Sequence, residues 1–168
     1  MKNIFKHKKG SILDLVFIMT ALLVFAMVVL IGFKLSSEVN TQVQDNIDIP
    51  TEAKTASTQL LGFYPGAIDN TFLFLTVGLA IVTLIMAALV KVHPIFIPLF
   101  IIGWIIIIFL AGICSNIYRA MAVNPNLAAQ ATALTYTSFI MGYLPLIVGG
   151  LGILLMIVIH KLGGGAGE

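Results

Sequence analysis

Four long apolar stretches constrain the fold of this chain more than any other feature of its sequence. Each is about 20 residues long, the length of α-helix that crosses the roughly 30 Å hydrocarbon core of a bilayer. Asp14 is the one Asp, Glu, Lys or Arg that they contain. The pattern predicts an all-α, polytopic membrane protein with four transmembrane helices in a single membrane domain, residues 1–168. The predicted spans cover residues 12–33, 72–90, 95–114 and 139–159.

The composition agrees with this prediction. Hydrophobic residues make up 60% of the chain and charged residues 10%, whereas soluble domains average about 25% charged residues. The net charge of +2 is too small to indicate a nucleic-acid partner. The expected partners are therefore the lipid bilayer and other membrane protein subunits, or a second copy of the chain. Because Cys114 is the single cysteine, an intramolecular disulfide and a cysteine-based metal site are excluded.

The first apolar stretch follows a basic segment, Met1–Gly10, and favours a retained signal-anchor helix. A secretory signal has an apolar region of about 7–15 residues and a small-residue cleavage site, but this run continues to Phe33 without such a site. Residues 8–14 also resemble a prepilin signal, in which processing follows a glycine and an acidic residue lies just inside the helix. That resemblance implies cleavage after Gly10, although pilins have one span and carry the acidic residue one position later.

The basic residues predict the orientation of the spans. Cytoplasmic segments of membrane proteins carry an excess of Lys and Arg. With the N-terminus inside, the inside segments hold six of these residues and the outside segments three. Both termini are therefore expected in the cytoplasm, or in the virion interior if the protein is viral. The six are Lys2, Lys6, Lys8, Lys9, Lys91 and Lys161, and the three are Lys34, Lys54 and Arg119.

The outside segments, 34–71 and 115–138, predict a small helical cap beyond the membrane. In the first, apolar residues recur every four positions among polar ones, which indicates that the first helix continues to a break at Pro50. In the second, a helix over residues 127–137 should follow Asn124 as N-cap. The apolar stripes of both helices are candidate partner interfaces, with packing inside the chain as the alternative. They comprise Leu35, Val39, Val43 and Ile47, and Leu127, Ala131 and Leu134.

Two further predictions concern the way the chain returns to the membrane. Thr51–Leu61 should form a short helix that Gly62 stops, because glycine commonly ends helices. Asp69, Asn70 and Thr71 then offer N-caps for the second span.

The third and fourth spans contain the residues expected to control helix packing. Pro145 should kink the fourth span, and Gly149, Gly150 and Gly152 should permit close approach of another helix. Trp104 lies near the middle of the third span, although tryptophan prefers the interface. Because its indole N–H needs an acceptor, it is expected to face another helix.

The sequence holds no recognisable catalytic, cofactor or metal motif. The middle of every span lacks the ionisable residue that ion or proton transport usually requires. The histidines, His7, His93 and His160, all fall at cytoplasmic span ends without enough further ligands for a metal. Arg119 is expected to anchor the chain at the interface, or to pair with Asp69.

These features favour a non-enzymatic integral membrane subunit with a structural or assembly role. Residues 8–15 (Lys-Lys-Gly-Ser-Ile-Leu-Asp-Leu) and 92–100 (Val-His-Pro-Ile-Phe-Ile-Pro-Leu-Phe) resemble small multi-span membrane proteins of lipid-containing viruses and environmental genomes. The resemblance implies a role in a virion membrane or in its assembly.

Two other classes of function stay open. An oligomeric pore or holin-like channel would need a polar stripe through a span, but Thr76 and Thr83 lie among large apolar residues. A membrane enzyme would need its polar residues to converge. The predicted topology instead places Asp14 and His93 on one side, and Asp69 and Arg119 on the other.

Overall fold

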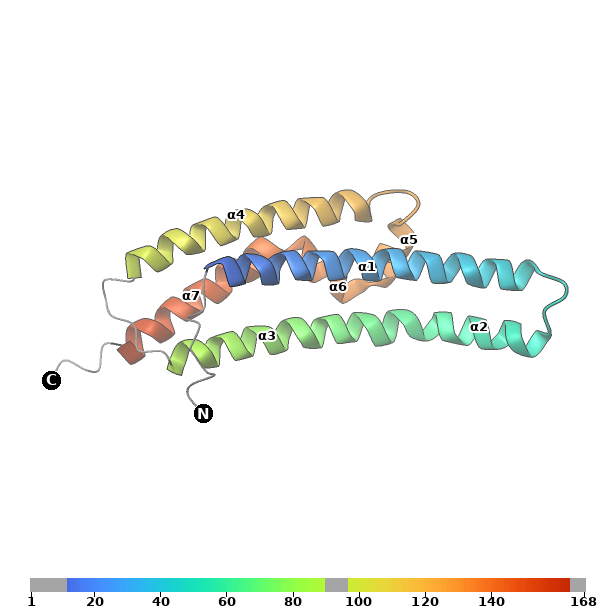
Figure 1. Cartoon of the computed structure of the whole chain (residues 1–168), viewed down its shortest axis with the longest axis horizontal. Helices are drawn as coiled ribbons and strands as arrows, with labels where there is room; N and C mark the ends of the chain where they lie inside the picture. Colours follow the sequence, from blue (N-terminus) through green and yellow to red (C-terminus); the bar gives the residue numbers. More distant parts are fainter. Residues whose placement is uncertain (1–11, 90–96, 164–168) are drawn as a thin grey trace, which may run out of the picture.

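The computed structural model describes the backbone of residues 12–89 and 97–163 and the side chains of residues 20–85, 98, 100–158 and 160. Every regular element in these ranges is a helix, as predicted (Figure 1). In chain order they are α1 (Ile12–Asp45), α2 (Thr51–Tyr64), the π-helical turn η1 (Pro65–Asp69), α3 (Asn70–Leu89), α4 (Ile97–Ala122), α5 (Ala128–Ala133), α6 (Thr135–Gly142) and α7 (Leu144–Gly163).

The long helices form an elongated bundle. α1 runs antiparallel to the α2–α3 rod, and α7 packs against both α3 and α4 (Figure 1). The start of α1, the end of α3, the start of α4 and the end of α7 lie at one end of the bundle, and the α1–α2 turn lies at the other. α3 and α4 run antiparallel (Figure 1), and the connection between them, residues 90–96, lies outside the described residues.

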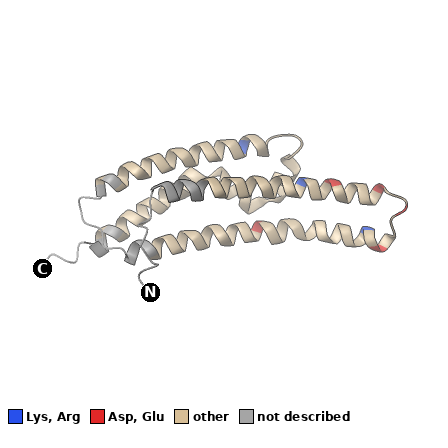
Figure 2. Ribbon diagram, in the orientation of Figure 1, with Lys and Arg blue, Asp and Glu red and all other residues tan. Residues whose placement is uncertain are grey.

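By length and composition, the described residues contain three helices able to cross a membrane, or four if a bent pair counts as one span. The three are Thr20–Asp45, Thr51–Ile85 and Phe100–Ala122, and the pair is Thr135–Gly142 with Leu144–Val158, bent by 68°. Figure 2 shows that the described Lys, Arg, Asp and Glu residues lie toward the α1–α2 end, so the described residues toward the other end carry no charge.

α1 continues beyond its apolar part, as predicted, and pairs with α2 through polar contacts. The Gln44 side-chain amide donates hydrogen bonds to the Lys54 carbonyl at 2.9 Å and the Thr58 hydroxyl at 3.1 Å. The Lys54 ammonium donates to the Gln44 carbonyl at 2.7 Å, and the Ser57 hydroxyl donates to Asn40 Oδ1 at 2.8 Å. We call residues 34–64, which hold these contacts, the outer hairpin.

The prediction that Gly62 stops α2 is wrong. The helix runs through Gly62 because the next turn is fixed on α1: the Tyr64 ring stacks on Phe33 at 4.9 Å between centroids, and its hydroxyl donates to the Val29 carbonyl at 3.1 Å. Pro65 follows, and since proline has no N–H and crowds the carbonyl four residues back, the helix widens into the π turn instead of ending. α3 therefore continues directly from η1 with Asn70 in helical conformation, and the predicted N-caps of the second span are wrong.

We expect Gly32→Ala to weaken the contact between α1 and α2. A β-carbon at Gly32 would lie 2.7 Å from the Tyr64 hydroxyl oxygen, so the ring would have to move and lose its hydrogen bond, at a cost of about 1 kcal/mol. Gly62→Ala is the matched control, because no atom lies within 4 Å of a β-carbon there. Unfolding in detergent by heat or SDS should rank the control above Gly32→Ala, and the reverse ranking would contradict the contact.

The segment after α4 departs further from the prediction. The expected helix over 127–137 is two helices, because the chain breaks at Leu134 (φ −89°, ψ 70°), which is completely buried. The expected kink in the fourth span is a full break at Tyr143, and Pro145 lies in the first turn of α7, where its missing N–H is tolerated. α6 is therefore a separate short helix, which lies across the end of α7.

The buried core surrounds this short helix. Residues from α1, α3, α4, α5, α6 and α7 meet in one apolar cluster, whereas much of the outward surface of α1, α3, α4 and α7 is apolar and exposed. The largest fully buried side chains are Tyr118, Phe72, Leu30, Leu134, Met141, Leu144 and Thr137.

Candidate functional site: a polar elbow between apolar helices

The break between α6 and α7 gathers most of the polar side chains that the bundle buries. We call residues 134–145 the elbow. Its short helix, α6, is held at its N-terminus by a residue of η1 and at its C-terminus by residues of α4. The first four N–H groups and last four carbonyls of any helix lack partners within that helix. The elbow satisfies several of its own with side chains that are distant in sequence.

Asp69 caps the N-terminus of α6. Its side chain is buried, with the residue only 5% exposed, and its oxygens accept the Tyr136 N–H at 2.8 Å and the Thr137 N–H at 2.6 Å. These two residues occupy the second and third positions of α6, where a capping oxygen is normally received from the preceding residue. Here Leu134 stands in that place and makes no such bond. The carboxylate also faces the positive end of the helix dipole.

A second polar chain ties α6 to α4 and α5. The Ser138 hydroxyl donates to the Ala131 carbonyl at 2.7 Å, and it lies 3.0 Å from the Tyr118 hydroxyl. Because the Ser138 hydroxyl donates its one proton to the Ala131 carbonyl, the Tyr118 hydroxyl is the donor in the bond between Tyr118 and Ser138. The Tyr118 ring is buried, so the hydroxyl network joins three helices inside the core.

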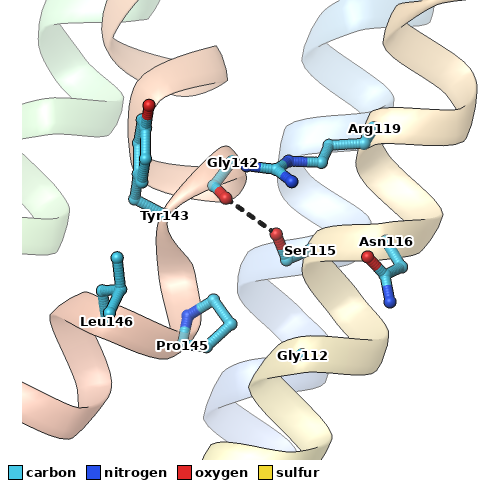
Figure 3. A pocket seen from close by; sticks show the side chains of 8 residues that line it. All are labelled: Gly112, Ser115, Asn116, Arg119, Gly142, Tyr143, Pro145 and Leu146. Atoms are coloured by element: carbon cyan, nitrogen blue, oxygen red, sulfur yellow. Dashed lines mark hydrogen bonds between the residues drawn. The ribbon is translucent and has the colours of Figure 1, made fainter.

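The C-terminus of α6 faces Ser115 and Arg119 of α4. The Ser115 hydroxyl donates to the Gly142 carbonyl at 3.0 Å, and the Arg119 guanidinium carbon lies 5.9 Å from the centroid of the Tyr143 ring (Figure 3). A cation at this end complements the negative end of the helix dipole, as the carboxylate does at the other. The two ends of α6 therefore face charged side chains of other helices, Asp69 of η1 at the N-terminus and Arg119 of α4 at the C-terminus.

An open pocket of about 260 Å³ lies between α4 and the elbow. Figure 3 shows its lining, which includes the apolar residues glycine, proline and leucine and the polar residues serine, asparagine and arginine. The lining residues are Gly112, Ser115, Asn116, Arg119, Gly142, Tyr143, Pro145 and Leu146.

The remaining packing candidates lie further along α7. Gly152 is buried under the Trp104 ring, which occupies the place that a β-carbon would take. Phe100 stacks on the same ring at 5.8 Å, while the indole N–H is buried and has no hydrogen-bond partner among the described residues. Gly149 lies near the Ile108 side chain, and Gly150 has no such neighbour.

The two apolar stripes have different surroundings. In the outer hairpin, Leu35 and Val39 are exposed, Ile47 is 94% exposed, and Val43 is half-buried. In the second stripe, Leu127 is half-buried, and Ala131 and Leu134 are buried inside the chain. Ala131 and Leu134 thus pack within the chain, which was the alternative left open above, whereas Leu35, Val39 and Ile47 of the first stripe are exposed.

Among the described side chains, no group of three or more His, Cys, Asp or Glu residues could hold a metal ion. Asp69 and Arg119 make no salt bridge with each other, since the carboxylate faces the start of α6 and the guanidinium its end. Thr76 and Thr83 donate to the carbonyls one turn back, of Phe72 and Leu79. The side chains of His7, Asp14 and His93 lie outside the described residues.

Sequence reasoning missed the contacts that build the elbow. Ser115, Ser138 and Tyr118 carry no spacing signal, because their partners lie on other helices. Asp69 gave a partial signal as a lone acid at the start of an apolar run, but a local N-cap explained it equally well.

No protein-family model, curated protein or solved structure matches this chain. Its function therefore has to be inferred from its own residues and contacts.

Proposed function

We propose that this chain is a non-enzymatic integral membrane subunit with four spans, which serves a larger membrane complex or a virion membrane by presenting its outer hairpin to another protein. The observation that carries the proposal is the polarity of that hairpin. Polar groups face each other between its two helices, and large apolar side chains face outward. A hairpin with no partner in water would bury its apolar side chains between the two helices and expose its polar ones.

The length of α1 supports a position of the hairpin beyond the bilayer. At about 1.5 Å per residue, its 34 residues extend about 50 Å, against roughly 30 Å of hydrocarbon. Lys34 and Glu38 form a salt bridge at 3.1 Å where the charged part of α1 begins. The distribution of Lys and Arg in the sequence favours cytoplasmic termini, or termini in a virion interior, so the hairpin would lie on the opposite side of the membrane.

Exposed apolar side chains on such a hairpin favour a protein partner. Leu35, Val39, Leu60 and Phe63 are between 50% and 72% exposed, in pairs one turn apart on α1 and on α2. Exposed apolar groups of a membrane-embedded helix are covered by lipid, but those of a projecting hairpin meet water unless another protein covers them. An oligomeric pore is the alternative, and it has less support because Thr76 and Thr83 direct their hydroxyls at their own helix.

The proposal is tested by gentle extraction from the native membrane, mass determination and identification of the proteins that remain bound. We expect a stoichiometric partner. We expect the double variant Val39→Lys, Ile47→Lys to bind that partner at least about tenfold more weakly, because a lysine cannot be buried in an apolar contact without losing its hydration. Unfolding should be unchanged, since both side chains are exposed.

Thr41→Lys is the matched control, because it adds a charge to an exposed polar position of the same helix. It should retain the partner. A double variant that keeps its partner would contradict the hairpin as the docking surface. Recovery of a closed homo-oligomer that conducts ions in a planar bilayer would favour the pore instead.

A further inference from the structure

The pocket at the elbow is graded from apolar to polar along the axis of α4. Gly112, Asn116 and Arg119 follow one another at about one helical turn each, and all three line it. On the elbow side, Pro145 and Leu146 lie toward the Gly112 end, and Tyr143 lies toward the Arg119 end (Figure 3). A ligand that filled the pocket would have to be apolar at one end and polar at the other.

The polar end has hydrogen-bond donors to spare. The Arg119 guanidinium carries five N–H groups; it is exposed, and it has no hydrogen bond or salt bridge to any described residue. Its described contact is with the face of the Tyr143 ring, which leaves the N–H edge free. Such an edge matches two oxygens of a phosphate. The Asn116 side chain is exposed one turn before Arg119, on the side of α4 away from the elbow (Figure 3), and the Ser115 proton is already donated to Gly142.

The apolar end opens onto an apolar surface. Leu146 lines the pocket and is 72% exposed, and Ile113 and Phe109 are exposed on the lower turns of α4. In a membrane, an acyl chain could leave the pocket along this surface without meeting a polar group. Arg119 itself sits in the last turn of α4, near the end of its apolar run, where the proposed topology would place it at the level of the headgroups.

We infer that this pocket binds an anionic phospholipid, with the phosphate on Arg119 and the first part of an acyl chain against Gly112, Pro145 and Leu146. The inference goes beyond the proposed docking role of the outer hairpin and requires only that the chain lies in a bilayer. Free phosphate shares the chemistry of the headgroup, but it would leave the apolar half of the pocket unfilled. The lipid is therefore the better match.

The test uses the full chain purified in mild detergent, without any partner, and native mass spectrometry to count retained lipid. Phosphatidylglycerol is the probe, and diacylglycerol with the same acyl chains controls for the phosphate. We expect phosphatidylglycerol to be retained and diacylglycerol to be lost. Arg119→Gln should weaken retention on the order of tenfold, because charge-assisted hydrogen bonds are lost. Lys34→Gln, which removes a charge outside the pocket, should not.

A second variant tests the apolar half independently of charge. Gly112→Leu should fill the lower pocket and reduce retention, whereas Gly78→Leu on α3 should not. A β-carbon meets no atom within 4 Å at either position, and unfolding in detergent by heat checks that both variants fold. Equal retention by Arg119→Gln and Lys34→Gln would overturn the inference. So would displacement of the lipid by inorganic phosphate, which would make the pocket a site for the free anion. Neither result would bear on the hairpin, because no partner is present.

Discussion

Replacing Asp69 with alanine is expected to destabilise the protein by about 2–4 kcal/mol, one of the two largest effects of a single substitution that the structure predicts. The carboxylate is buried and accepts the N–H groups of Tyr136 and Thr137. Alanine would leave the buried Thr137 N–H and the partly buried Tyr136 N–H without this acceptor, and a buried unpaired group costs about 1–3 kcal/mol. Unfolding by heat or SDS in detergent micelles measures the loss.

Two further variants separate capping from charge. Asp69→Asn keeps one oxygen acceptor and should fall between the wild type and alanine, since its NH₂ group would face an N–H donor. Asp48→Ala removes an exposed acid in the α1–α2 turn and should change stability by no more than about 0.5 kcal/mol. If Asp69→Ala unfolded like Asp48→Ala, the carboxylate would not hold the elbow.

Gly152→Ala is expected to destabilise the chain by about 1–3 kcal/mol, because the new methyl group would occupy the space of the Trp104 ring. The ring is confined by Phe100 stacked against it, so it cannot move aside freely. Gly150→Ala lies two residues away on the same helix and meets no atom within 4 Å. It should be neutral or slightly stabilising, since alanine is the better helix former.

A double-mutant cycle identifies the source of the strain. In the background of Trp104→Leu, whose shorter side chain leaves room, Gly152→Ala should lose most of its effect. The same unfolding measurement serves for all four proteins of the cycle. An unchanged effect of Gly152→Ala without the indole ring would assign its cost to something other than this contact.

The regular helices could be predicted because their signals are local. An apolar run longer than a membrane is thick, followed by a stripe with helical period, was enough to predict that α1 extends past its apolar part. The all-α class followed from the same runs. The structure has three or four candidate spans, depending on whether α6 and α7 count as one.

The elbow and the passage from α2 into α3 could not be predicted, because long-range contacts override local preferences at both places. Gly62 and the Asp69-Asn70-Thr71 group are ordinary helix-end signals. The helix nevertheless continues through Gly62, because Tyr64 stacks on Phe33. The Asp69 carboxylate caps α6 and not the helix that follows it in the chain. The partners of Asp69 lie 67 and 68 residues away in the chain. Likewise, the sequence singled out Trp104 and Gly152 separately, but only the packing of α4 on α7 brings them together.

The unbroken passage from α2 through η1 into α3 gives the molecule a mechanical property. Thr51–Ile85 is one rod of 35 residues, about 50 Å long, and its first part, α2, belongs to the outer hairpin. Helices answer a change in bilayer thickness by tilting. Because Asp69 sits about 27 Å along the rod from Thr51, a tilt of about 10° would swing the tip sideways by about 5 Å. If a partner docks on the outer hairpin, as proposed above, a change in the thickness of the surrounding lipid would therefore shift the position of that docking surface.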